Sequence, residues 1–123
     1  MSYSAGELVN RPWGVWEVLV KGENYAVKRV TIDPGKRLSL QFHHHRLELW
    51  TIVAGQGEVE LDGARLTADL GDQFRIPKLA RHRIANTGSL PLVLIEVQFG
   101  SRLDEGDIVR LMDDFGRVPA TAE

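Results

Sequence analysis

The feature of this sequence that most limits its fold is the short interval between turn signals. Clusters of Gly, Pro, Asn and Asp, such as DPGK and NTGSLP, recur along the chain and leave only short apolar-rich stretches between them. Stretches of this length and composition favour strands over helices. The expected strands are residues 15–20, 25–32, 37–43, 48–54, 57–61, 73–77, 82–86 and 92–99. Strands at this spacing predict an all-β antiparallel sandwich or barrel.

Two local patterns refine this expectation. The dipeptide Asp62-Gly63 lies between two short alternating stretches and is typical of a two-residue hairpin turn. Near the C-terminus, apolar residues are spaced as on one face of a helix: Ile108, Leu111, Met112 and Phe115. We therefore expect a short C-terminal helix, with Asp104 and Asp107 near its cap and Gly116 at its end.

Composition excludes several classes of protein. At 123 residues the chain has the size of one domain, which we place at residues 1–123. A net charge of −2 favours neither nucleic acid nor an anionic membrane as a partner. The most apolar run, residues 91–99, is too short to span a bilayer. The first residues lack the basic start and apolar stretch of a signal peptide, so we expect a cytoplasmic protein.

Four polar residues are placed so that neighbouring strands can bring them together. Strand alternation puts Gln41 and His43 on one face, and Glu48 follows early in the next strand. A later strand begins at His82. The chain has no cysteine, and this set of two imidazoles and two oxygen donors suits Zn, Mn, Fe, Co or Ni. We predict a divalent metal site, with zinc as first choice, because burying these groups without a cation would leave their polar atoms uncompensated.

The spacing of these residues resembles the two motifs of the cupin superfamily. The resemblance rests on glycine, proline, asparagine and ligand positions in register: Gly35, Gln41, His43, Glu48 and Gly55, then Gly71, Pro77, His82 and Asn86. It implies an antiparallel double-stranded β-helix, the jelly-roll barrel of cupins, with the metal inside. In this family the position of Gln41 is commonly histidine.

Longer stretches narrow the resemblance to type II phosphomannose isomerase. These are RPWG, VKRVTIDPGKRLSLQFHHHRLELW, IPKLARHRIANTGSLPLVLIEVQFGSRL and DIVRLMDDFGR. In bacteria this cupin module is usually fused behind a mannose-1-phosphate guanylyltransferase domain, in the GDP-mannose branch of polysaccharide biosynthesis. The resemblance implies interconversion of mannose 6-phosphate and fructose 6-phosphate. The sequence departs from the family at Leu49, where histidine is usual, at Leu79, where glycine is usual, and in GSRLDEGDIVR, which lacks an aromatic residue.

The implied reaction moves a proton between C1 and C2 and needs a base near neutral pKa. We assign the proton shuttle to His45, with Lys28 and Glu96 as further candidates. Phosphate needs fixed positive charge, for which Arg46 or Lys28 are suitable. Gln98 shares a strand face with Glu96. The expected substrate-binding residues are Arg46, Lys28, Gln98 and Trp50.

Two alternatives remain open at this point. One is a non-catalytic cupin that binds a sugar or sugar phosphate, which the changes at Leu49 and Leu79 favour. The other is a different metal-dependent cupin enzyme, such as an Fe(II) oxygenase, although the glutamine ligand argues against it. The apolar faces opposite the site, which include Leu40, Phe42, Leu49 and Val53, need cover, so we expect a homodimer.

Overall fold

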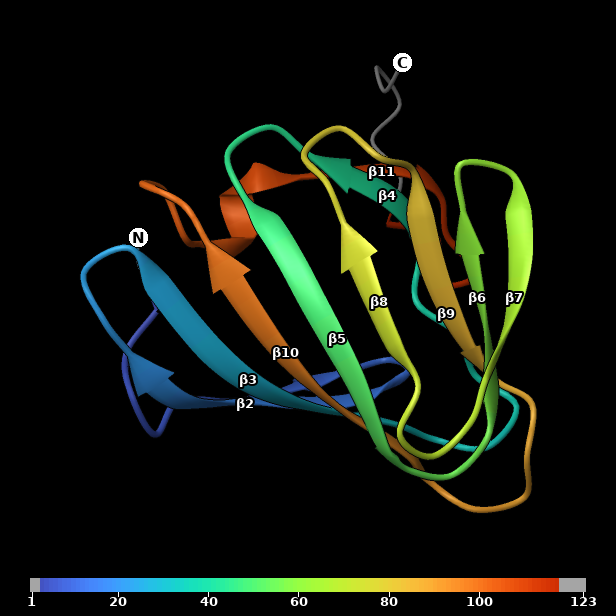
Figure 1. Cartoon of the computed structure of the whole chain (residues 1–123). Coiled ribbons are helices and arrows are strands. Elements are labelled where there is room, and N and C mark those ends of the chain that lie inside the picture. Colours follow the sequence, from blue (N-terminus) through green and yellow to red (C-terminus); the bar gives the residue numbers. More distant parts are fainter. Residues whose placement is uncertain (1–2, 118–123) are drawn as a thin grey trace.

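A computed structural model of the chain describes residues 3–117 and consists almost entirely of antiparallel strands (Figure 1). One sheet has six strands in the order β1 (Leu8–Arg11), β2 (Gly14–Lys21), β3 (Tyr25–Ile32), β10 (Leu92–Phe99), β5 (Leu47–Ala54) and β8 (Gln73–Ile76). The other has five, in the order β11 (Ile108–Met112), β4 (Leu40–His43), β9 (His82–Asn86), β6 (Gly57–Leu61) and β7 (Ala64–Ala68). The all-β prediction is confirmed.

Several expected elements form where the sequence places them. β3, β6, β9 and β10 have the predicted bounds, and β4 begins later than expected, at Leu40. The predicted hairpin joins β6 to β7, with Leu61 paired to Ala64. Asp62 and Gly63 have φ values of 47° and 87°. Both are left-handed, as the tight turn of a twisted hairpin requires.

The predicted C-terminal helix is wrong for residues 108–115. Ile108–Met112 forms the strand β11, which pairs with β4. The sequence pattern was ambiguous because the same apolar residues can occupy either structure over so short a stretch. Hydrogen bonding to the edge of β4 outweighs the modest helical preference of a short isolated segment. The only helical turn in the described residues is the 3₁₀ turn η1 (Glu105–Asp107), which Asp104 caps by accepting a hydrogen bond from the Gly106 N–H.

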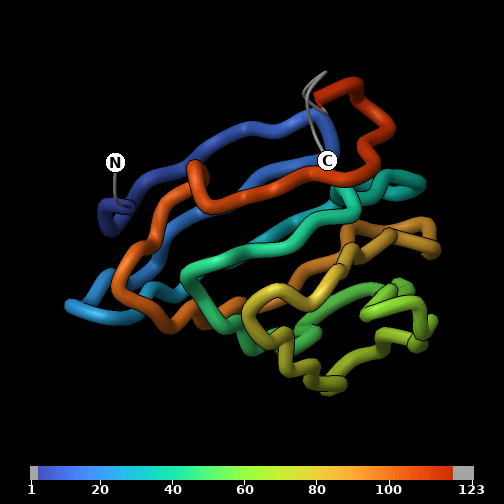
Figure 2. The backbone as a smooth tube through the Cα atoms, turned by 90° about the horizontal axis from the view of Figure 1, so that it is seen from above, coloured from blue at the N-terminus to red at the C-terminus, as the bar shows by residue number. Residues whose placement is uncertain are grey.

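The two sheets face each other and bury a core that includes three tryptophans. The large core side chains come from both sheets and from the turn between β1 and β2: Trp13, Trp16, Ile32, Trp50, Ile52, Ile76, Ile84, Leu92 and Leu94. Figure 2 shows the red C-terminal segment beside the teal segment of β4, with which β11 pairs. No helix within residues 3–117 has the length and apolar character that a membrane crossing needs.

Candidate metal centre and active site

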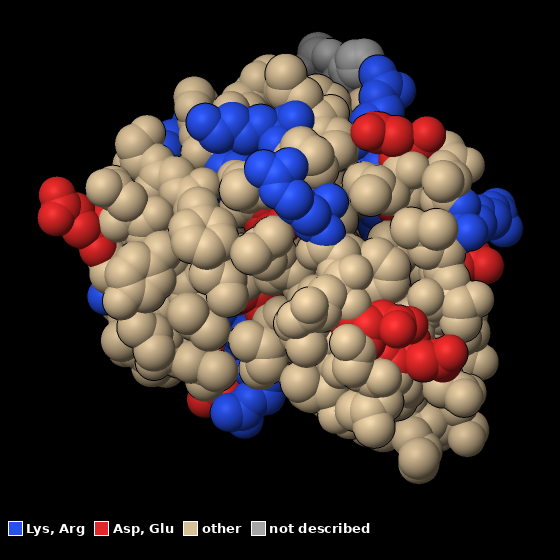
Figure 3. Space-filling model, viewed as in Figure 1, with Lys and Arg blue, Asp and Glu red and all other residues tan. Residues whose placement is uncertain are grey.

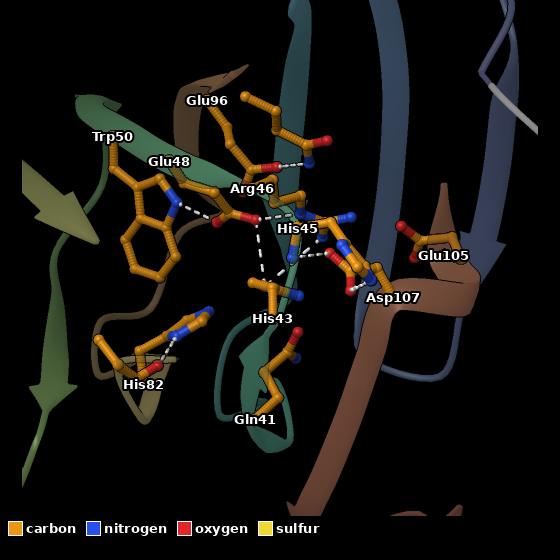
Figure 4. Close-up of polar contacts among 12 residues, drawn as sticks. Gln41, His43, His45, Arg46, Glu48, Trp50, His82, Glu96, Glu105 and Asp107 are labelled. Atoms are coloured by element: carbon orange, nitrogen blue, oxygen red, sulfur yellow. Dashed lines mark hydrogen bonds and ion pairs between the residues drawn. The ribbon is translucent and has the colours of Figure 1, made fainter. Parts of the chain in front are cut away.

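Three of the four predicted metal ligands meet inside the barrel. His43 on β4, Glu48 on β5 and His82 on β9 are buried, and their potential ligand atoms lie within 4.8 Å of one another. Gln41 lies directly opposite His82 in the β4–β9 pairing, so its side chain points to the same face. Figure 4 shows these four side chains around one space. Residues from both sequence motifs therefore converge as predicted.

His82 is held with one ring nitrogen available. Its Nδ1 lies 2.8 Å from the carbonyl oxygen of Ala80, which can only accept a hydrogen bond. Nδ1 therefore carries the proton, and the lone pair of Nε2 is left for a ligand. Burial lowers the pKa of His82 to about 4, so the ring is neutral at pH 7. Neutral imidazole is the form that binds metal.

Gln41 is oriented by its own strand. Its Nε2 donates to the Ser39 hydroxyl at 2.9 Å and to the Ser39 carbonyl at 3.3 Å. Because the amide nitrogen is bonded to Ser39, the amide oxygen is turned away from it, and that oxygen is the atom that a cation would bind. Gln41 lines the same cavity as His82 and Glu48.

Glu48 makes the most contacts of the set. Its Oε1 accepts from the Trp50 indole N–H at 2.9 Å, and its Oε2 accepts from Arg46 Nε at 2.8 Å. Oε2 also lies 3.1 Å from His43 Nε2. Burial alone would raise the pKa of Glu48, but His43 and Arg46 hold it well below its ordinary value. Glu48 is therefore a carboxylate at neutral pH and a poor proton donor.

The expectation that these groups lack compensation without a cation is wrong for Glu48. Arg46, expected from the sequence to bind phosphate, is only 3% exposed and supplies the counter-charge itself. His43 is less well satisfied, because its Nδ1 is buried with no hydrogen-bond partner in the described residues. That unpaired nitrogen, the free Nε2 of His82 and two oxygen donors match the ligand types of a divalent metal site. The residues present therefore fit a metal.

A cavity of about 470 Å³, including the part open to solvent, adjoins these residues. Glu96, on β10, lines it and is 7% exposed. Its carboxylate accepts a hydrogen bond from Gln98 Nε2. Burial and the nearby charge of Glu48 raise the pKa of Glu96 to about 7. Gln98 is fully buried and does not line the cavity, so it holds Glu96 from behind, whereas Trp50 lines the cavity and holds Glu48.

Lys28 and Arg46 belong to a buried network around Tyr3. The Tyr3 hydroxyl accepts from Lys28 Nζ at 2.9 Å and from Arg46 Nη1 at 3.2 Å, and it donates to Glu105. Lys28 Nζ also lies 3.2 Å from the Glu105 carboxylate and 3.9 Å from the centre of the Trp16 ring. Neither cation is a solvated surface charge, and both have donors already bonded to protein groups.

The structure separates His45 from this site. Its side chain is 48% exposed, and it does not line the cavity. Its nearest charged partner is Asp107, with 3.9 Å between Nε2 and Oδ1. Asp107 was expected near the cap of the C-terminal helix, but it is buried and accepts hydrogen bonds from the backbone N–H groups of His44 and His45. It therefore fixes the turn between β4 and β5, the two strands that carry three of the ligands.

The two departures at leucine lie outside the cavity. Leu49 is on the opposite face of β5 from Glu48 and is 39% exposed. Leu79 is 57% exposed and has a φ of 69°, a left-handed conformation that explains why glycine is usual there. The Leu79 N–H donates to the His43 carbonyl at 2.8 Å, so the turn before His82 is still anchored to β4.

Sequence reasoning missed Tyr3, Glu105 and the role of Asp107. These residues lie outside the cupin motifs, and Tyr3 and Glu105 are separated by 102 positions. No local periodicity links them. The one available signal was the acidic run DEGD, which begins at the capping residue Asp104. Such a run predicts a turn but does not predict which residues the turn contacts.

Comparison with known proteins identifies relatives of this domain. The family model described as mannose-6-phosphate isomerase C-terminal matches residues 2–113. Mannose-1-phosphate guanylyltransferase of Escherichia coli K12 is 46% identical over 110 residues, which are 89% of this chain and 23% of that protein. The alginate biosynthesis protein AlgA of Pseudomonas aeruginosa is 45% identical over 114 residues, 93% of this chain and 24% of that protein. The chain thus spans about a quarter of the length of these relatives.

Solved structures agree on the fold. The capsular polysaccharide assembling protein CapF of Staphylococcus aureus superposes with a TM-score of 0.76 at 20% identity, over 86% of this chain and 34% of that one. A proposed sugar phosphate isomerase from Acidithiobacillus ferrooxidans gives 0.59 at 26% identity, over 66% of this chain and 52% of that one. The fold is the double-stranded β-helix of cupins. With a family match over most of its length, this chain belongs to the mannose-6-phosphate isomerase C-terminal family.

Proposed function

We propose that this domain is a metal-dependent aldose–ketose isomerase that interconverts mannose 6-phosphate and fructose 6-phosphate. The observation that carries the proposal is that one cavity is lined both by predicted metal ligands, including Glu48 and His82, and by the Glu96 carboxyl, which titrates near neutrality. An isomerase of this type needs both a cation for the sugar oxygens and a base for the carbon-bound proton. The family match supports this reaction, and the proposed sugar phosphate isomerase activity of the Acidithiobacillus protein supports the same class of reaction.

A divalent cation held by Gln41, His43, Glu48 and His82, with zinc as first choice, would polarise the C1 and C2 oxygens and stabilise negative charge that develops on them. Trp50 and Arg46 hold the Glu48 carboxylate in place for this task.

Glu96 is the better candidate for the proton shuttle. As a carboxylate it can remove the proton at C2, hold it, and return it to C1 of the enediol. With transfer of the hydroxyl proton from O2 to O1, this converts the aldose to the ketose. Gln98 keeps the carboxyl oriented from behind. Lys28 is the register partner of Glu96 on β3 and places a fixed positive charge beside it. His45, which is outside the cavity, has no comparable access.

The relatives' names suggest the setting of the reaction. AlgA is an alginate biosynthesis protein, and XanB of Xanthomonas campestris, 48% identical over 110 residues, is a xanthan biosynthesis protein. We place the isomerase at the entry to the GDP-mannose branch of polysaccharide biosynthesis, in the cytoplasm, where it would supply mannose 6-phosphate.

The test is to load the protein separately with Zn, Mn, Co and Fe and to measure conversion of mannose 6-phosphate to fructose 6-phosphate. Turnover with at least one metal, lost on chelation, is the expected result. Absence of turnover with every metal would contradict the proposal, and oxygen uptake with Fe would identify an oxygenase instead.

A second candidate is a non-catalytic sugar-phosphate-binding domain. The ion pair between Arg46 and Glu48 favours it, because the carboxylate is stabilised without a metal. Binding of mannose 6-phosphate without turnover under every loading condition would support this alternative.

A further inference from the structure

The rim of the cavity carries an excess of positive charge. The partly exposed lining residues are Arg11, Leu38, Glu105, Ile108, Arg110 and Arg117. Three of them are arginines, and the one acid, Glu105, is already bonded to Tyr3 and Lys28. Figure 3 shows several Lys and Arg side chains, with a smaller acidic group beside them, at the upper end of the molecule, where β4 and β11 lie in Figure 1. An anion at this rim would be attracted from solution.

The three arginines differ in how far their donors are used. Arg117 donates from Nε and Nη2 to Asp113 at 2.7 and 3.0 Å. Arg11 lies 3.9 Å from Glu105, at the limit of an ion pair. Arg110 makes no ion pair or side-chain hydrogen bond with any residue between 3 and 117, and its Nε is buried without a partner. A buried guanidinium donor with no acceptor is costly unless a ligand supplies one.

The position of Arg110 relates it directly to the metal site. In the β11–β4 pairing, Arg110 lies opposite Gln41 and Ile108 lies opposite His43. Residues opposite each other in an antiparallel pair point to the same face, so Arg110 lies beside a predicted ligand. Arg110 also lines the cavity and is partly exposed. Burial and the nearby charge of Arg117 lower the pKa of Arg110, although Glu105 and Asp113 act in the opposite direction.

The shape of the substrate calls for such a group at the rim. In a hexose 6-phosphate the reacting C1 and C2 lie at one end of the chain and the phosphate at the other. With C1 and C2 at the ligands, the phosphate is directed away from the interior. Lys28 and Arg46, expected from the sequence to bind phosphate, lie at the interior end and are bonded to Tyr3, Glu48 and Glu105.

We propose that Arg110, flanked by Arg11 and Arg117, is the phosphate anchor of this cavity. The assignment of the anion as the 6-phosphate of a sugar rests on the proposed function. Guanidinium groups bind phosphate through paired N–H donors, and Arg110 is the rim arginine whose donors are uncommitted within the described residues.

The test compares Arg110→Gln and Arg110→Lys with the control Arg65→Gln, which removes an equal charge from an exposed position on β7. Binding of mannose 6-phosphate, mannose and inorganic phosphate is measured by calorimetry on metal-loaded protein, together with metal content and thermal unfolding. We expect Arg110→Gln to weaken binding of mannose 6-phosphate and phosphate about 10- to 100-fold, with mannose binding and metal content unchanged. Arg110→Lys should lose less affinity for mannose 6-phosphate and phosphate, because it keeps the charge. Arg65→Gln should bind both with the affinity of the wild type.

The outcomes separate this inference from the proposed function. Phosphate binding that depends on Arg110, in a protein that does not isomerise mannose 6-phosphate, supports the anchor and contradicts the isomerase. Isomerisation with unchanged affinity in Arg110→Gln supports the isomerase and overturns the anchor. Equal losses for mannose and mannose 6-phosphate, or no phosphate binding by the wild type, would also overturn the anchor.

Discussion

The strands that build the site carry opposite chemistry on their two faces. The inner face of β5 holds Glu48 and Trp50, both 2% exposed, while its outer face holds Leu49 and Val53, 39% and 42% exposed. The buried carboxylate of Glu48 and the exposed outer leucine and valine depart from the usual arrangement of apolar residues inside and polar residues outside. The inner polar groups are tolerated because neighbouring side chains supply hydrogen bonds and counter-charges. The outer leucine and valine are apolar and exposed to solvent, so burying them against another surface would be favourable.

The largest effect is expected from removing an imidazole on the inner face. His43→Ala or His82→Ala should lower bound metal to background and turnover below detection, because each takes away one of the few available ligands. The control is His44→Ala, which changes an exposed neighbour. Metal content by mass spectrometry and the isomerase assay provide the measurement, with circular dichroism to show that the fold survives. Full metal binding in both variants would contradict the assignment of the metal site to the inner face.

The second-largest effect is expected from Glu96→Gln, which should lower kcat about 10²- to 10⁴-fold and retain metal binding. In the wild type, Glu96 has a pKa raised to about 7, so it is a competent base above that pH and protonated below it. The rate should therefore fall as the pH drops below about 7. A parallel His45→Ala variant tests the competing assignment; if it loses turnover and Glu96→Gln does not, the base lies outside the cavity.

Tyr3→Phe tests how the buried charges are satisfied. The hydroxyl is bonded to Lys28, Arg46 and Glu105, so its removal leaves buried groups one partner short. We expect a loss of about 1–3 kcal/mol in the free energy of unfolding, measured by urea denaturation. The control Tyr25→Phe removes a hydroxyl from a residue that is 42% exposed and should cost little. Equal effects in the two variants would show that the network adds no stability.

Substitutions on the outer face should change the association of two chains and leave the turnover of each chain unchanged. We expect a second copy of the chain to cover it, because Leu49, Ile95 and Val97 line one groove there. Leu49→Glu should shift a dimer toward monomer in sedimentation velocity while turnover per chain is kept. Leu70→Glu, at a 73% exposed loop position, is the matched control. A wild type that stays monomeric at all concentrations would contradict the predicted homodimer.

The smallest effect is expected at Leu79. Its left-handed φ of 69° strains a side chain that has a Cβ, and glycine relieves this strain. Leu79→Gly should raise the free energy of unfolding by about 0.5–1 kcal/mol, less than the full relief because glycine also gains freedom in the unfolded chain. Thermal and urea unfolding measure the change. A loss of stability would show that the 57% exposed side chain packs usefully in solution.

Strand alternation explains how much of this arrangement the sequence could predict. It placed Gln41 and His43 on one face, and Glu48 and Leu49 on opposite faces, because side chains alternate with a period of two once a strand is recognised. It failed where partners come from distant segments. Tyr3 and Glu105 meet Lys28 and Arg46 only through the fold, so burial of those two cations had no local signature. At residues 108–112 the apolar spacing led to a helix prediction that is wrong, because pairing with β4 makes this segment a strand.

The most direct measurement is anomalous diffraction from crystals grown with cobalt or zinc. We expect one strong peak inside the barrel, about 2.0–2.2 Å from nitrogen atoms of His43 and His82 and from oxygen atoms of Gln41 and Glu48. Crystals soaked in excess cation that show no peak there, with Glu48 still bonded to Arg46 and Trp50, would contradict it.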